Sequence, residues 1–120
     1  MDKRLFHRVD VSANGELHWA TKSRVGRLTK HKEHIRTENV SIDGAKILVP
    51  GKHHFPKGAR ARLKLGIEFC DVEVREAVSA NEGTILRLIF ISPSARFVAV
   101  LEKSMRVTTH ERDDFISSWM

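Results

Sequence analysis

Apolar and polar residues alternate through the middle of the chain, with the period of two that a half-buried β-strand requires. One alternating run covers residues 60–69, a second covers 72–78 and a third covers 85–91. Shorter runs lie at residues 9–19 and 45–49. Side chains expected to share a face are Ala61, Leu63, Leu65, Ile67 and Phe69 in the first run, Val72, Val74 and Val78 in the second, and Leu86, Leu88 and Phe90 in the third. The pattern predicts a protein that is mainly β.

Residues typical of tight turns separate these runs. The turn signals are Asn14-Gly15, Asp43-Gly44, Pro50-Gly51, Pro56-Lys57-Gly58 and Asn81-Glu82-Gly83. Short strands joined by tight turns favour a small antiparallel barrel, because closure removes the exposed edges of a sheet. We therefore expect a barrel of about six strands.

The period changes after the last strand. Ser92-Pro93 is typical of a helix start, with serine as the N-cap and proline as the first helical residue. Phe97, Leu101 and Met105 then recur every four residues, as on the apolar face of a helix. This predicts a C-terminal helix lying across the barrel.

The chain is expected to form one domain, since 120 residues can bury one hydrophobic core but not two. We expect a flexible basic lead at residues 1–10, a barrel with its terminal helix at 9–106 and a tail at 107–120. Apolar residues in the tail have the spacing of a short second helix; they are Phe115, Ile116 and Trp119.

The net charge of +6 favours anionic partners. Residues 1–36 hold nine Lys and Arg against four Asp and Glu, so the positive field belongs to the N-terminal third. On charge alone, nucleotides, nucleic acids and membrane headgroups all remain open.

A single cysteine, Cys70, excludes an internal disulfide and fits a reducing cytoplasm. We interpret it as a small core residue, with a reactive thiol as the alternative. The first residues lack the apolar stretch of a secretory signal, and no run is long enough to cross a bilayer. The expected location is cytoplasmic.

Catalytic and metal-binding patterns are missing from the sequence. It contains no nucleophile elbow, phosphate-binding loop or evident nucleophile–base pair. His31 with His34, and His53 with His54, have no cysteine or carboxylate set that would complete a metal site. We therefore expect neither an enzyme nor a metalloprotein, and no cofactor.

Two short motifs remain as candidates for ligand binding. Arg4 and Arg8 offer two planar, permanently charged guanidinium groups four residues apart. Residues 39–44 read Asn-Val-Ser-Ile-Asp-Gly, a pattern of the form N-x-S-x-x-G. Residues 10–15 fit the related pattern D-x-S-x-x-G, but their Asn14-Gly15 is a strong hairpin dipeptide, so we interpret that match as a turn.

The order of these features resembles the PilZ domain, the bacterial receptor module for cyclic dimeric GMP (c-di-GMP). The basic lead comes first, a strand pair follows, the N-x-S-x-x-G motif opens the next strand, and a helix ends the barrel. The resemblance implies a PilZ-type β-barrel with a C-terminal helix, and c-di-GMP as the ligand. Its matching motif positions are Arg4, Arg8, Asn39, Ser41 and Gly44, with Lys3 as a secondary ligand contact. This motif opens with Asn where Asp is commoner, which removes a charge and adds donors.

The chemistry of these residues suits such a ligand. Arginine can stack on a purine, or donate paired hydrogen bonds to guanine or to phosphate. Asn39 and Ser41 can offer hydrogen bonds to a guanine edge, and Gly44 would let the backbone come close to the base.

The expected function is therefore a second-messenger receptor that relays c-di-GMP binding to a protein effector. The resemblance implies motility, pilus function, or exopolysaccharide and biofilm output as the process controlled. Two alternatives stay open. One is a PilZ-like adaptor that works through protein contacts without nucleotide, and the other is a nucleic-acid-binding small barrel, favoured by the basic charge.

Overall fold

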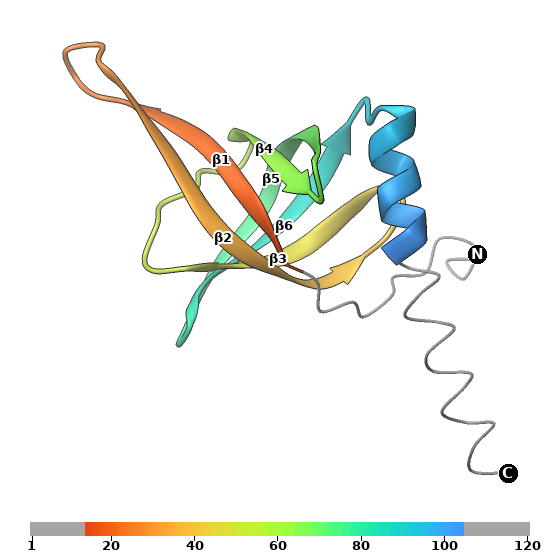
Figure 1. Ribbon diagram of the computed structural model, residues 1–120. Coiled ribbons are helices and arrows are strands. Elements are labelled where there is room, and N and C mark those ends of the chain that lie inside the picture. Colours follow the sequence, from red (N-terminus) through yellow and green to blue (C-terminus); the bar gives the residue numbers. More distant parts are fainter. Residues whose placement is uncertain (1–13, 105–120) are drawn as a thin grey trace, which may run out of the picture.

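Six antiparallel strands form a closed barrel in the order β1-β2-β3-β6-β5-β4 (Figure 1). The computed structural model describes residues 14–104. The strands are β1 Asn14–Lys22, β2 Leu28–Val40, β3 Gly44–Pro50, β4 Arg60–Leu65, β5 Glu68–Ala80 and β6 Gly83–Ile91. The mainly β, six-stranded antiparallel barrel predicted from the alternation is confirmed.

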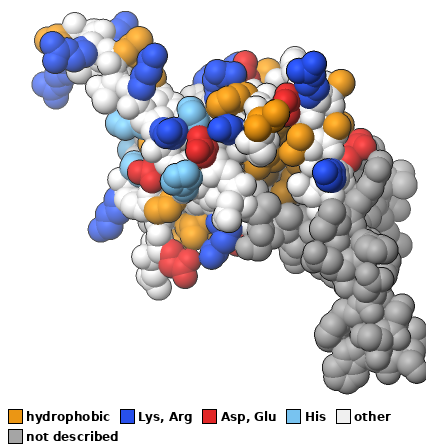
Figure 2. Space-filling view, in the orientation of Figure 1, with side chains coloured by type: hydrophobic (Ala, Val, Ile, Leu, Met, Phe, Trp, Pro, Cys, Tyr) orange, Lys and Arg blue, Asp and Glu red, His pale blue; other side chains and the backbone are white. Residues whose placement is uncertain are grey.

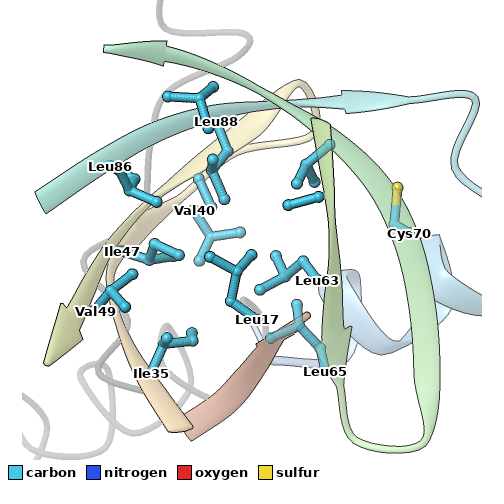
Figure 3. Packing of buried hydrophobic residues seen from close by; sticks show 14 of the residues in the cluster. Leu17, Ile35, Val40, Ile47, Val49, Leu63, Leu65, Cys70, Leu86 and Leu88 are labelled. Atoms are coloured by element: carbon cyan, nitrogen blue, oxygen red, sulfur yellow. The ribbon is translucent and has the colours of Figure 1, made fainter. Parts of the chain in front are cut away.

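The inward-facing residues of all six strands make one hydrophobic core (Figure 3). Fully buried members include Leu17 on β1, Ile47 on β3, Leu63 on β4 and Leu86 on β6. Cys70 lies in the same cluster with its side chain buried, which confirms it as a core residue. Burial of this apolar surface supplies most of the driving force for folding.

A helix over residues 95–104 packs against the barrel, as predicted. Phe97 and Leu101 are buried in the core cluster, and the Phe97 ring meets Phe90 edge-on with centroids 5.2 Å apart. The predicted N-cap is wrong by two residues. The hydroxyl of Ser94 accepts the Phe97 N–H at 3.1 Å, whereas Ser92 has a φ of 46° in the preceding bend.

The run at residues 60–69 is not one strand, contrary to the predicted shared face. β4 ends at Leu65, Gly66 adopts a φ of 62° in a turn, and β5 begins at Glu68. Ile67 is 83% exposed in this turn, and Phe69 pairs with Lys64 on the outer face. The turn moves the inward face from odd to even positions, since Leu65 pairs with Glu68 and Leu63 with Cys70. The sequence conceals this because Ile67 and Phe69 are apolar although neither faces the core.

The predicted placement of Val78 on one face with Val72 and Val74 is also wrong. The pairing of β5 with β6 shifts between Val74 and Glu76 at a β-bulge. One extra residue reverses the faces of the residues that follow it. Val78 is therefore 51% exposed, while Val72 and Val74 are fully buried.

The predicted hairpin turn at Asn14-Gly15 is also wrong. Both residues belong to β1, where Asn14 pairs with Arg36 and Gly15 pairs with Ile35. Strand pairing on a barrel overrides the local turn preference of the dipeptide. The first hairpin instead turns at residues 23–27 and extends away from the barrel (Figure 1).

Several expectations fall outside residues 14–104, namely the lead at 1–10, the tail at 107–120 and Met105. Within the described range, no helix has the length and apolar character needed to cross a membrane. No cluster of three or more His, Cys, Asp or Glu side chains in that range is placed to hold a metal ion.

Candidate functional site

The N-x-S-x-x-G motif forms the turn that carries the chain from β2 into β3. The N–H of Ser41 donates to the carbonyl oxygen of Gly44 at 2.9 Å and closes the turn. The carbonyl oxygen of Asp43 accepts from the N–H of Phe90 on β6 at 2.8 Å. The turn is therefore fixed to a third strand, which gives the motif a rigid position on the barrel.

The Ser41 side chain is buried inside this turn. Its hydroxyl donates to the carbonyl oxygen of Gly44 and accepts from the N–H groups of Asp43 and Gly44, each at 3.3 Å. Serine side chains commonly organise turns in this way. The serine therefore shapes the turn, and its predicted hydrogen bond to a ligand stays a prediction.

A β-bulge decides where Asn39 points. The register of β2 against β3 shifts between Thr37 and Asn39, so Glu38 is an extra residue. Thr37 and Val40 are both buried, whereas Asn39 pairs with the half-buried Lys46 on the outer side. Without the bulge, residues 37 and 39 would share the inner face.

The side-chain oxygen of Asn39 is buried and has no hydrogen-bond partner among residues 14–104. It is the one side-chain oxygen or nitrogen in the described part of the chain with that property. A buried acceptor without a donor is destabilising by about 1–3 kcal/mol, and such groups are uncommon in folded proteins. The atom is a candidate acceptor for a ligand N–H group.

Gly44 is required by the packing of β3 on β6. A Cβ atom at this position would overlap the backbone carbonyl oxygen of Leu88 and come within 3.1 Å of the Ile89 Cα. The missing side chain thus allows two strands to approach each other. The predicted approach of a ligand base to Gly44 is a separate proposal, and the strand packing accounts for the glycine without it.

Two cations that the motifs did not include follow Asn39 across the outer surface, Lys46 on the next strand and Arg87 on the strand after it. Lys46 on β3 pairs with Asn39 on one side and with Arg87 on β6 on the other. Lys46 and Arg87 line a hollow of about 280 Å³ together with Glu76, Val78 and Ile85. The alternation around these positions could have shown that both cations face outward, but only the strand register shows that they are neighbours.

Arg4, Arg8 and Lys3 lie outside the described residues. Of the predicted site residues, the structure therefore places Asn39, Ser41 and Gly44 together at one turn. The role of the basic lead stays a prediction.

Two groups with displaced pKa values lie on β1 and β5, away from this turn. A hydrogen bond from His18 at 2.9 Å lowers the pKa of the Glu16 carboxyl, and burial partly opposes the shift. Burial raises the pKa of the Cys70 thiol, so the thiol stays protonated near neutral pH. This agrees with its place in the core and gives no sign of a reactive thiolate.

No family model matches the chain, and comparison with curated proteins gave no significant match. Solved structures give clear matches. The PilZ domain with c-di-GMP of YcgR from Escherichia coli superposes with a TM-score of 0.61 and 14% identity, over 97% of this chain and 98% of that one. Whole YcgR from Escherichia coli in complex with c-di-GMP gives a TM-score of 0.65 and 15% identity, over 100% of this chain.

A third match is to the inhibitor of motility from Bacillus subtilis (MotI/DgrA), with a TM-score of 0.63 and 16% identity over 93% of this chain. The chain spans only 52% of whole YcgR and 54% of the Bacillus subtilis protein. At these identities the likeness shows the fold. The chain has the PilZ-type barrel with its C-terminal helix, as the sequence predicted.

Proposed function

We propose that this PilZ-type barrel is a receptor for c-di-GMP. The observation that carries the proposal is the buried, unpartnered Asn39 oxygen on the outer face, beside the turn that Ser41 organises. The same fold occurs in a PilZ domain solved with c-di-GMP. The ligand would supply the donor that Asn39 lacks.

The chemistry of guanine fits this acceptor. The guanine edge carries an N2 amino donor, which an amide oxygen can accept. Arg4 and Arg8 would complete the site from the lead, by stacking on a base or by donating paired hydrogen bonds to guanine or phosphate. Lys3 would add a secondary contact to the ligand.

Lys46 and Arg87 extend the proposed site toward the hollow on β3 and β6. Their charges would attract the two phosphates of the ligand, with Glu76 opposite Arg87 limiting the net charge there. Exposed charges of this kind lose strength as salt screens them. Affinity should accordingly fall with ionic strength.

Binding would order residues 1–10 against the barrel and change the surface offered to a protein effector. This is a switch between ordered and disordered states of a segment rather than a reaction. The process controlled would be motility, pilus function or exopolysaccharide output.

A nucleotide-independent adaptor is the second candidate, and two observations favour it. Ser41 already uses its hydroxyl within the turn, and Gly44 is needed for the packing of β3 on β6. Both residues would therefore be retained in a PilZ-type barrel that binds only a protein. Capture of one defined effector with unchanged yield on addition of c-di-GMP would support the adaptor.

Isothermal titration calorimetry with c-di-GMP tests the receptor. Wild type should bind at low salt, and Arg8→Ala should weaken binding at least about tenfold, since a charge-assisted hydrogen bond contributes about 1.5–3 kcal/mol. Arg24→Ala is the matched control, because Arg24 lies at the exposed hairpin tip at the other end of β2. Absence of binding to wild type, or equal binding by Arg8→Ala, would contradict the proposal.

A further inference from the structure

The hairpin of β1 and β2 continues beyond the barrel as a two-stranded ribbon, whose base is held by Trp19 against His53 and Phe55 (Figure 1). β1 pairs with β4 only at residues 16–18, and β2 pairs with β3 only from Arg36 onward. Between these limits the two strands pair with each other, from Trp19 with His31 to Lys22 with Leu28. We call residues 19–32 the ribbon.

The ribbon is strongly basic. From Leu17 to Lys32 the chain contains no Asp or Glu and five Lys or Arg, which are Lys22, Arg24, Arg27, Lys30 and Lys32. None of the five forms an ion pair within residues 14–104, although Lys32 helps to lower the pKa of the Glu16 carboxyl. Arg60 and Arg62 on β4, by contrast, each meet a carboxylate at 3.6 Å. The charge of the ribbon is therefore available to a partner.

These cations are distributed along the ribbon. Arg24 and Arg27 lie in the turn, Lys22 is opposite Leu28, Lys30 is opposite Ala20, and Lys32 is opposite His18 at the barrel. At about 3.3 Å per residue the charges extend over roughly 15 Å. They form a line rather than a ring around one point.

The tip is a hydrogen-bonded turn with two exposed aliphatic side chains at and next to it. Ser23 and Arg27 are joined by a backbone hydrogen bond of 2.9 Å, and the Ser23 hydroxyl accepts the Arg27 N–H at 3.1 Å. Val25 is 89% exposed and Leu28 is 65% exposed. Figure 2 shows hydrophobic and basic side chains together on this projecting part.

A cleft of about 510 Å³ lies at the base of the ribbon, between it and β4. Its lining includes Lys30, Arg60, Arg62 and Asp71. Because Arg60 and Arg62 are paired with Glu73 and Asp71, Lys30 is the cation that the ribbon itself adds to this cleft.

We propose that the ribbon binds double-stranded DNA. The major groove of B-DNA admits a two-stranded β-ribbon, and cations spread along the ribbon could then contact successive phosphates. Exposed aliphatic side chains at the tip could then contact thymine methyl groups, which are displayed in the major groove. The proposal does not rest on c-di-GMP binding, because the two sites share no residue.

The geometry favours DNA over a membrane surface. A flat bilayer touching the tip would reach Arg24 and Arg27 but not Lys32, which lies at the barrel. A groove that takes the ribbon lengthwise can engage all five cations. Anionic vesicles are therefore a comparison in the test.

Fluorescence anisotropy with a short labelled DNA duplex tests the proposal. With five phosphate contacts, the logarithm of the binding constant should fall with the logarithm of salt concentration at a slope of about −4.5, a loss of several hundredfold between 50 and 200 mM. Arg24→Gln with Arg27→Gln should make the slope less steep by about 1.8. Arg96→Gln with Lys103→Gln, on the exposed face of the helix, removes the same charge and should leave the slope near the wild-type value.

Three results would overturn the proposal. They are no binding of the duplex at low salt, an equal decrease of the salt slope in the variant Arg96→Gln with Lys103→Gln, and tighter binding to phosphatidylserine vesicles than to DNA. Circular dichroism should show that both double variants fold. The ribbon variant should keep wild-type affinity for c-di-GMP, so failure of this proposal is distinguishable from failure of the receptor function.

Discussion

Asn39 is half-buried on the outer side of β2, its side-chain oxygen is buried without a partner among the described residues, and a bulge in β2 holds it there. A protein without a ligand at this place would gain stability by losing that acceptor. The proposed ligand would give this acceptor its missing donor, and the role of Asn39 in binding stays a prediction.

Asn39→Ala should separate the effect of Asn39 on stability from its effect on ligand affinity. The unliganded variant should be as stable as wild type or more stable by up to about 1–3 kcal/mol, because the unpartnered acceptor is removed. Its affinity for c-di-GMP should fall by about tenfold or more. Chemical denaturation and calorimetry measure the two quantities. Asn39→Asp keeps an acceptor and should bind better than the alanine variant; a destabilised Asn39→Ala with full affinity would assign the residue to the fold.

Gly44→Ala should destabilise the barrel by about 2–3 kcal/mol, since the new methyl overlaps the Leu88 carbonyl. Gly58→Ala is a useful comparison, because its Cβ would meet no atom within 4 Å but its φ is 89°. Positive φ alone costs roughly 1–2 kcal/mol. Urea unfolding should rank Gly44→Ala as the less stable variant, and the reverse order would show that β3 and β6 can move apart.

At the scale of elements, the helix depends on a cap that differs from the one its sequence suggested. The Ser94 hydroxyl holds the Phe97 amide, and Phe97 anchors the helix in the core. Ser94→Ala should therefore cost about 1 kcal/mol of stability.

Ser92→Ala provides the matched control for this cap. Ser92 is exposed in the bend before the helix, so its substitution should change the unfolding midpoint less than Ser94→Ala does. Thermal unfolding of the two variants makes the comparison. Equal losses, or a larger loss in Ser92→Ala, would restore Ser92-Pro93 as the helix start.

β2 is the element that connects the two proposed surfaces. Its first residues form the ribbon, and its last residues carry Asn39 into the motif turn. Leu28 and Asn39 are eleven residues apart, or roughly 35 Å along an extended strand. Ligands at the two ends can accordingly be studied independently.

At the scale of the molecule, the strands and helix were predictable because inward-facing positions of a small barrel are apolar and outward-facing positions are mostly polar. Every run of alternation proved to contain strand residues, and Phe97 and Leu101 face the core at helical spacing. Irregularities were not predictable in this way. The bulges near Glu38 and Arg75 depend on how neighbouring strands pair. The turn at Gly66 is concealed because Ile67 and Phe69 continue the apolar alternation outside the core.

The candidate site was predictable only in part. The motif identified Asn39, Ser41 and Gly44 as candidates, because all three lie within six consecutive residues. Lys46 and Arg87 come from different strands, so only the register places Lys46 beside Asn39 and Arg87 beside Lys46. The roles of Ser41 inside the turn and of Gly44 against β6 likewise depend on contacts that local sequence does not specify.

The most direct test of the central claim is an amide chemical-shift map of the full chain with and without c-di-GMP. The receptor account predicts perturbations concentrated at residues 3–8 and 39–46, with residues 19–32 of the ribbon unaffected. No perturbation at saturating ligand, or changes confined to the ribbon, would contradict it.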